Sequence, residues 1–106
     1  MERIGISARS MLWFNNAAQY MEYMAIFEDA HLMSPTYAHW KKRATDAFES
    51  LRRSGITVVK VQASAHEFKA WCSSHAIGLN AEGRTEFATF KAAQQIHQSH
   101  SRNKNP

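Results

Sequence analysis

The sequence predicts an α+β fold with about four helices and a minor two-stranded sheet in a single compact domain. Apolar residues recur at three- and four-residue spacing in several segments, which is typical of amphipathic helices. A run of β-branched residues at 56–61 favours a strand. A chain of 106 residues can bury one core but not two. We therefore expect one globular domain over residues 1–100 and a disordered tail over residues 101–106, which have no apolar anchor.

The first part of the chain has a short strand-like segment and then a strongly apolar helix. Residues 3–8 alternate isoleucine with small or polar residues, a pattern that fits either a strand or a flexible leader. Asn15 is a suitable N-cap for a helix that extends to about His31. This helix is apolar over most of its circumference, which is typical of a central helix or of one covered by a partner subunit.

A second, amphipathic helix is predicted over residues 35–54. Ser34 is a suitable N-cap, and Pro35 suits the first helical position because proline has no N–H to satisfy there. Apolar residues on one side alternate with charged residues on the other. Gly55 follows the cations Arg52 and Arg53, which suit the negative end of a helix dipole, so we place the helix C-terminus there.

The second half of the chain predicts a strand followed by two helices. Residues 56–61 are apolar on both faces, as expected for a buried strand. Ser64 and Glu67 have the spacing of a capping box, which predicts a helix to about His75. Asn80 is a suitable N-cap for a fourth helix that extends to about residue 100.

Composition favours the cytoplasm and excludes a membrane crossing. The single cysteine, Cys72, cannot form an internal disulfide, and residues 1–5 lack the basic and then apolar pattern of a secretory signal. The longest apolar stretch, residues 11–33, is interrupted by asparagines, carboxylates and a histidine that hydrocarbon would not accept.

Three patterns resemble metal sites, and none is complete. Two pairs with i, i+3 spacing supply four possible zinc ligands, but an antiparallel helical hairpin would separate the pairs by about 25 Å. The pairs are Cys72 with His75 and His97 with His100. Glu28 and His31 form one copy of the E-x-x-H motif that di-iron bundles use twice. We therefore expect no metal and no other cofactor.

Catalysis has one candidate nucleophile, Cys72. A reactive thiol needs a helix N-terminus or a nearby cation to lower its pKa, whereas Cys72 falls in the C-terminal half of its predicted helix, beside Trp71. A thiol in the core explains this position better. We assign no catalytic residue and expect a protein that is not an enzyme.

An interaction surface is the leading functional hypothesis. Trp13, Tyr20, Tyr23 and Met24 could hold a second subunit, another protein or a small apolar ligand, with a place in the core as the alternative. A thin sheet would also leave the edge of the strand at 58–61 unpaired, which invites pairing with another chain. We therefore expect a homo-oligomer, most simply a dimer.

Nucleic-acid binding is the alternative function. The formal net charge is +4, and the second predicted helix carries Lys41, Lys42, Arg52 and Arg53. Such residues can contact phosphates, although Asp46 and Glu49 share the helix and reduce its positive charge. This basic face predicts an accessory protein that binds nucleic acid.

A resemblance accompanies these patterns. The segment Gly55–Val61, followed by Glu67-Phe68, Trp71-Cys72, Arg84 and Phe87-Ala88, resembles small uncharacterised bacterial proteins, including the kind carried on mobile gene cassettes. It covers about half of the chain. The resemblance brings no motif of known activity, so it assigns no functional residue.

Overall fold

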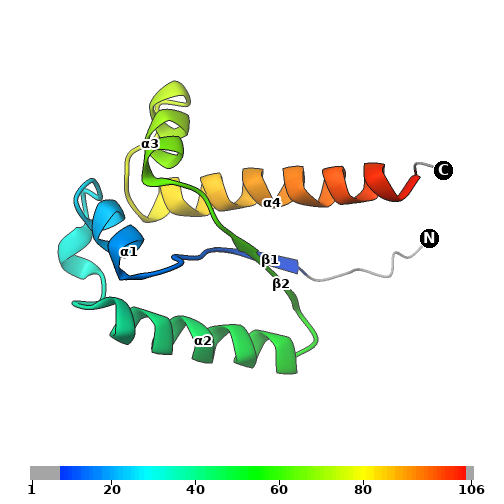
Figure 1. Ribbon diagram of the computed structural model, residues 1–106, viewed down its shortest axis with the longest axis horizontal. Helices are drawn as coiled ribbons and strands as arrows, with labels where there is room; N and C mark the ends of the chain where they lie inside the picture. The colour runs from blue at the N-terminus through cyan, green and yellow to red at the C-terminus, as the bar shows by residue number, and fades with distance from the viewer. Residues whose placement is uncertain (1–7, 105–106) are drawn as a thin grey trace.

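A two-stranded parallel sheet lies between two layers of helix in the computed structural model, which describes residues 8–104 (Figure 1). The elements follow one another as β1 (Ala8–Leu12), α1 (Ala17–Met24), the 3-10 turn η1 (Ala30–Leu32), α2 (Tyr37–Arg53), β2 (Thr57–Val61), α3 (Ala65–Ser74) and α4 (Ala81–Lys104). The predicted α+β class with four helices and a two-stranded sheet is confirmed.

The strands are parallel, so the chain must cross over between them. Ala8 is opposite Thr57, and Leu12 is opposite Val61. Parallel neighbours need a connection of a dozen or more residues, which α1, η1 and α2 provide. Figure 1 shows the sheet edge-on, with α4 above it and α2 below it.

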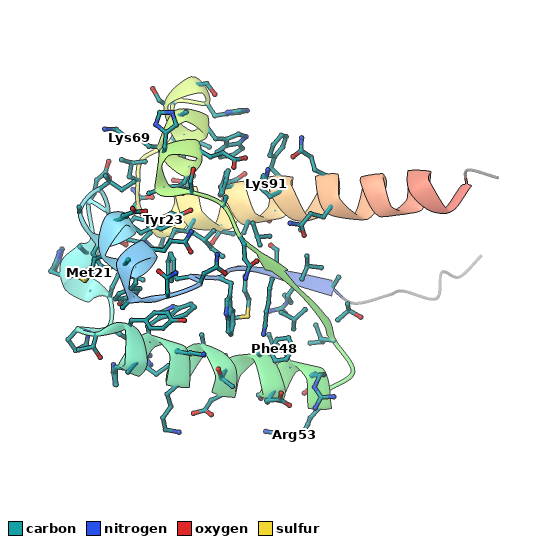
Figure 2. The ribbon with its side chains drawn as sticks, viewed as in Figure 1. Met21, Tyr23, Phe48, Arg53, Lys69 and Lys91 are labelled. Carbon is teal, nitrogen blue, oxygen red and sulfur yellow. The ribbon has the colours of Figure 1, made fainter. Side chains whose placement is uncertain are left out.

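The two faces of the sheet have different coverings. On the α4 face, Leu12 and Val59 pack against a buried cluster made of Val61 with Ala88 and Ala92 of α4. On the α2 face, Lys60 holds its Nζ atom 4.1 Å from the centre of the Trp13 ring and 4.3 Å from that of Phe48. Figure 2 shows Phe48 on the side of α2 that faces the strands.

An aromatic core fills the end of the molecule beyond the strands. The Phe14 ring lies 4.9 Å from Tyr23 and 4.7 Å from Trp40, centre to centre. The buried tyrosines also satisfy their hydroxyl groups: Tyr20 donates to the carbonyl of Ser34, and Tyr23 donates to that of Ala63 at 2.7 Å. The core therefore fixes α1 against the segments before α2 and α3.

Most of the predicted caps form. Ser64 accepts a hydrogen bond from the backbone N–H of Glu67, and Asn80 accepts one from Gly83. Gly55 has a φ of +85°, the left-handed conformation that favours glycine after a helix. The reciprocal half of the predicted capping box is replaced, because the Glu67 carboxylate pairs with Lys91 of α4 at 2.7 Å.

The first two helices begin and end differently from the prediction. Asn16, rather than Asn15, caps α1, and Thr36 caps α2 one residue after Pro35. The helix predicted to reach His31 ends at Met24. Its last turns are replaced by a loop because Glu28 and Asp29 bind groups that come from the other half of the chain.

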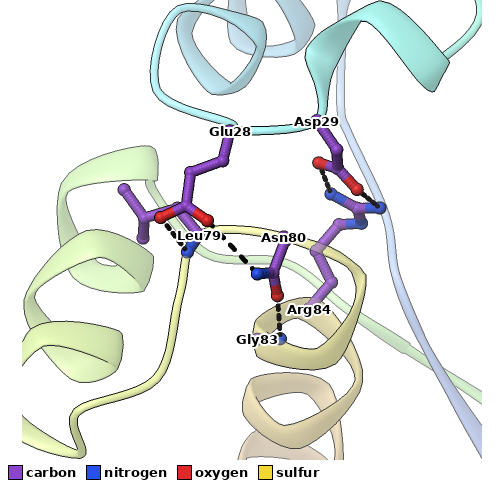
Figure 3. Close-up of polar contacts among 6 residues, drawn as sticks. All are labelled: Glu28, Asp29, Leu79, Asn80, Gly83 and Arg84. Carbon is purple, nitrogen blue, oxygen red and sulfur yellow. Dashed lines mark hydrogen bonds and ion pairs between the residues drawn. The ribbon is translucent and has the colours of Figure 1, made fainter.

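That loop docks on the connection between α3 and α4 (Figure 3). The Glu28 carboxylate accepts hydrogen bonds from the backbone N–H of Leu79 and the side chain of Asn80, both at 3.2 Å. Asp29 receives two hydrogen bonds from the Arg84 guanidinium, at 2.9 and 3.0 Å. The guanidinium also lies 4.5 Å from the centre of the Phe27 ring. These contacts tie α1 to α4.

At the ends of the chain, the C-terminal prediction is wrong and most of the N-terminal one is untested. The segment predicted as a strand or a leader, residues 3–8, lies outside the described residues except for Ala8, which begins β1. α4 continues to Lys104, four residues into the predicted tail, and residues 105–106 lie outside the description.

We predict that Arg84→Ala lowers the free energy of unfolding by about 1–3 kcal/mol, because it leaves a largely buried carboxylate without its partner. The side chains of Arg84 and Asp29 are only 18% and 17% exposed. As a control, Lys42→Ala breaks a pair with Asp46 that is 77% and 68% exposed, and should change stability by less than about 0.5 kcal/mol. Urea unfolding measures both changes.

The pair of Asp29 and Arg84 also predicts that the stability of the fold depends on pH. The hydrogen bonds from Arg84 hold the pKa of Asp29 below its ordinary value. The resulting stabilisation is therefore complete above the unfolded pKa of about 3.9 and is lost as the pH falls through the folded pKa. Wild type should exceed Asp29→Asn in stability near pH 6 and approach it at about pH 2. A difference that stays constant over this range would contradict the assignment.

Candidate interaction surface

The aromatic residues predicted to bind a partner lie in the core. Tyr20 and Tyr23 are 0% exposed, Trp13 is 7% exposed, and Met24 is half-buried against the same cluster. Burial raises the pKa of both tyrosine hydroxyl groups. Since these rings hold the domain together, a partner could reach them only by unfolding it, and we do not retain this surface as a binding site.

A different candidate surface is the outer edge of β1, where backbone N–H and C=O groups have no partner strand. The backbone N–H of Trp13 donates to the carbonyl of Val61 at 2.8 Å. In a parallel pair, alternate residues direct both backbone groups at the partner strand. Arg9 and Met11 therefore face β2, whereas Ser10 and Leu12 direct their N–H and C=O groups away from it. Within the described part of the chain, no other group hydrogen bonds these outward groups.

A hollow lies on each side of this edge. The one between β1 and α4 measures about 350 Å³ and is lined by Ser10, Val59, Thr89 and Ala93, among others. The one between β1 and the start of α2, also about 350 Å³, includes Met11 and Trp40 in its lining. An added strand would project alternate side chains into the two hollows, because successive strand residues point to opposite faces.

The lining of these hollows is mostly apolar or small, and each also includes one exposed arginine, Arg9 in the upper hollow and Arg43 in the lower one. Leu32, in η1, is 73% exposed and lines the lower hollow together with half-buried Met33. On α4, the exposed residues that line the upper hollow are Thr85, Thr89 and Ala93. A large exposed leucine beside an unpaired strand edge is the kind of feature that marks interaction sites.

The edge of β2 is less suited to pairing. The predicted open edge, Val58–Val61, contains Val61, which is fully buried beneath α4. By the same alternation, the outward backbone groups of β2 belong to Val58 and Lys60. The exposed Lys60 is held against two aromatic rings, and the exposed Arg52 lines the hollow beside Val58. Lysine and arginine at a sheet edge discourage strand addition.

The four basic residues of the alternative hypothesis are all exposed on α2, but they do not form a free cationic face. Lys42 pairs with Asp46 at 3.4 Å, and Arg52 pairs with Glu49 at 2.8 Å. Figure 2 places Arg53 at the far end of α2, away from its N-terminal turn. The carboxylates therefore neutralise two of the four charges.

The predicted metal and catalytic patterns gain no support from the geometry. Residues 8–95 contain no cluster of three or more histidine, cysteine, aspartate or glutamate side chains with the geometry of a metal site. The side chains of His97 and His100 are not described. Glu28 binds Leu79 and Asn80 instead of acting with His31. In the described part of the chain, no helix has the length and apolarity that a membrane crossing requires.

Sequence reasoning missed the β1 edge for a physical reason. Residues 8–12 read Ala-Arg-Ser-Met-Leu and lack both the β-branched run and the strict alternation that indicate a strand. β1 forms because it pairs with β2 and packs against α4. Comparisons of the sequence and structure with protein-family models, curated proteins and solved structures found no match.

We predict that the Cys72 thiol is unreactive in the folded protein. Its side chain is 0% exposed, and burial, with a smaller effect of the Glu28 charge, raises its pKa. Alkylation by N-ethylmaleimide should be about 100-fold or more slower than in urea, because it must wait for the structure to open. Mass spectrometry over time measures the rate. A thiol that reacts equally fast in both states would revive the nucleophile hypothesis.

Proposed function

We propose that this protein is a non-enzymatic interaction module that binds another polypeptide along the outer edge of β1. The observation that carries the proposal is the pair of hollows on either side of the unpaired outer edge of β1. The bound segment would be extended, and backbone hydrogen bonds to Ser10 and Leu12 would supply much of its affinity. Its alternate side chains would enter the two hollows and supply specificity.

The small size of the sheet supports this function. Two strands alone are marginal in water, and parallel sheets are normally buried on both faces and extended by further strands. Helices cover both faces, whereas no element of residues 8–104 covers the outer edge of β1. The charged residues beside this edge are the exposed Arg9 and Arg43. A third strand added at this edge would pair the outward backbone groups of β1 and widen the sheet.

Nucleic-acid binding through α2 has weaker support, because two of its four cations already pair with carboxylates. The two functions differ in salt dependence. Phosphate binding falls steeply as salt rises, whereas strand addition beside apolar hollows should not. A steep loss of DNA or RNA binding with salt, abolished by Lys41→Glu with Arg53→Glu, would favour the basic face.

We predict that Ser10→Pro abolishes peptide binding without unfolding the domain. Proline removes the outward N–H of Ser10, which the sheet itself does not use, and proline is tolerated at strand edges. Ser10→Thr retains the N–H and should bind like wild type. The probe is a displayed library of random ten-residue peptides selected on immobilised wild-type protein.

Selected peptides should alternate apolar with other residues and bind Ser10→Pro at least about tenfold more weakly than Ser10→Thr. Circular dichroism checks that both variants fold. Peptides that bind Ser10→Pro as well as wild type, or a library with no binders on protein that sedimentation shows to be monomeric, would overturn the proposed function.

A further inference from the structure

We infer that the occupant of the β1 edge is β1 of a second copy of this chain, paired antiparallel about a two-fold axis that passes beside Ser10. This inference rests on the proposed function and names its partner. The result would be a continuous four-stranded sheet in which each two-stranded half keeps its own helical layers. Such a closed, isologous dimer uses the same surface on both copies.

Hydrogen bonding and charge together select the register. Only residues with outward backbone groups can exchange hydrogen bonds across the axis, which restricts the pairing to Ala8, Ser10 and Leu12. Ser10 opposite Ser10 of the second copy pairs Ala8 with Leu12 and uses all five residues of β1. A shift that centres on Arg9 would place two arginines directly opposite each other, which is destabilising. The Ser10-centred register instead puts Arg9 opposite methionine.

The helices above the sheet fit the same arrangement. α4 packs on both strands and contacts β1 more extensively than β2. Strands are about 4.8 Å apart, so two α4 helices on a four-stranded sheet would lie no more than about 10 Å apart. That separation equals ordinary helix packing, provided that the facing side chains are small. The α4 residues beside the β1 edge are Thr85, Thr89 and Ala93.

The β1 edge lies on the side of the molecule away from the viewer in Figure 1, where β2 crosses in front of β1. Perpendicular to that view the molecule spans 45 × 33 Å. A specific interface needs about 800 Å² from each copy, which is about half of an outline of that size. The exposed Leu32 lies on the rim of the lower hollow, where a second copy would cover it.

Disulfide trapping tests the register. With Ser10→Cys, the two introduced thiols face each other across the axis, at the Cα separation of about 5.5 Å that suits a disulfide. In the matched control Arg9→Cys, the thiols are diagonal neighbours about 7–8 Å apart, beyond disulfide reach. Cys72 remains in both variants, because it is fully buried. Cross-linking is followed on non-reducing gels under mild oxidation, and sedimentation equilibrium measures association of the unmodified protein.

A concentration-dependent dimer, with Ser10→Cys cross-linking about tenfold faster than Arg9→Cys, is the expected result. Faster cross-linking of Arg9→Cys would overturn the register. The inference would be overturned if the dimer persists in Ser10→Pro and neither Ser10→Cys nor Arg9→Cys forms a cross-link, because another surface must then join the copies. A strict monomer would also overturn it, yet library peptides that bind wild type and not Ser10→Pro would leave the proposed function standing.

Discussion

The pairing of β1 with β2 in parallel is the constraint on which the rest of this structure depends. Parallel strands cannot be joined by a tight turn, so the whole of α1, η1 and α2 is committed to the crossover. Both faces of a parallel sheet must be covered, which explains why α4 packs above the strands and α2 below them. The aromatic core around Phe14 and the ion pair between Asp29 and Arg84 then hold the crossover against α3 and α4.

The same constraint leaves an edge without a partner. A two-stranded sheet has two outer edges, and different residues lie at each of them. β2 carries Lys60 at its edge, held by Trp13 and Phe48, whereas β1 presents outward backbone groups between two hollows whose linings are mostly small or apolar. Lysine at an edge is a common protection against unwanted pairing. β1 instead carries its cation, Arg9, near the start of the strand, and the outward backbone groups of Ser10 and Leu12 lie beside mostly small or apolar residues. The proposed interaction follows from this asymmetry.

Local chemistry made part of the fold predictable. The β-branched run of β2, the caps Ser64 and Asn80 and the glycine at 55 all act over four residues or fewer, so the sequence displays them directly. The end of α1 was not predictable, because it depends on Glu28 meeting Leu79, 51 residues away. The apolar circumference of α1 fitted either a core or a partner surface, and only tertiary packing buries Tyr20 and Tyr23. The open edge of β1 likewise depends on which side of it β2 occupies.

Amide hydrogen exchange along β1, measured by NMR at low and high protein concentration, tests the central claim most directly. At low concentration the account predicts slow exchange for Met11 and Trp13, whose N–H groups face β2, and fast exchange for Ser10 and Leu12, whose N–H groups face outward. At high concentration Ser10 and Leu12 should become protected as a second strand covers them. Protection of all four amides at every concentration, or exposure of Ser10 and Leu12 at every concentration, would contradict the account.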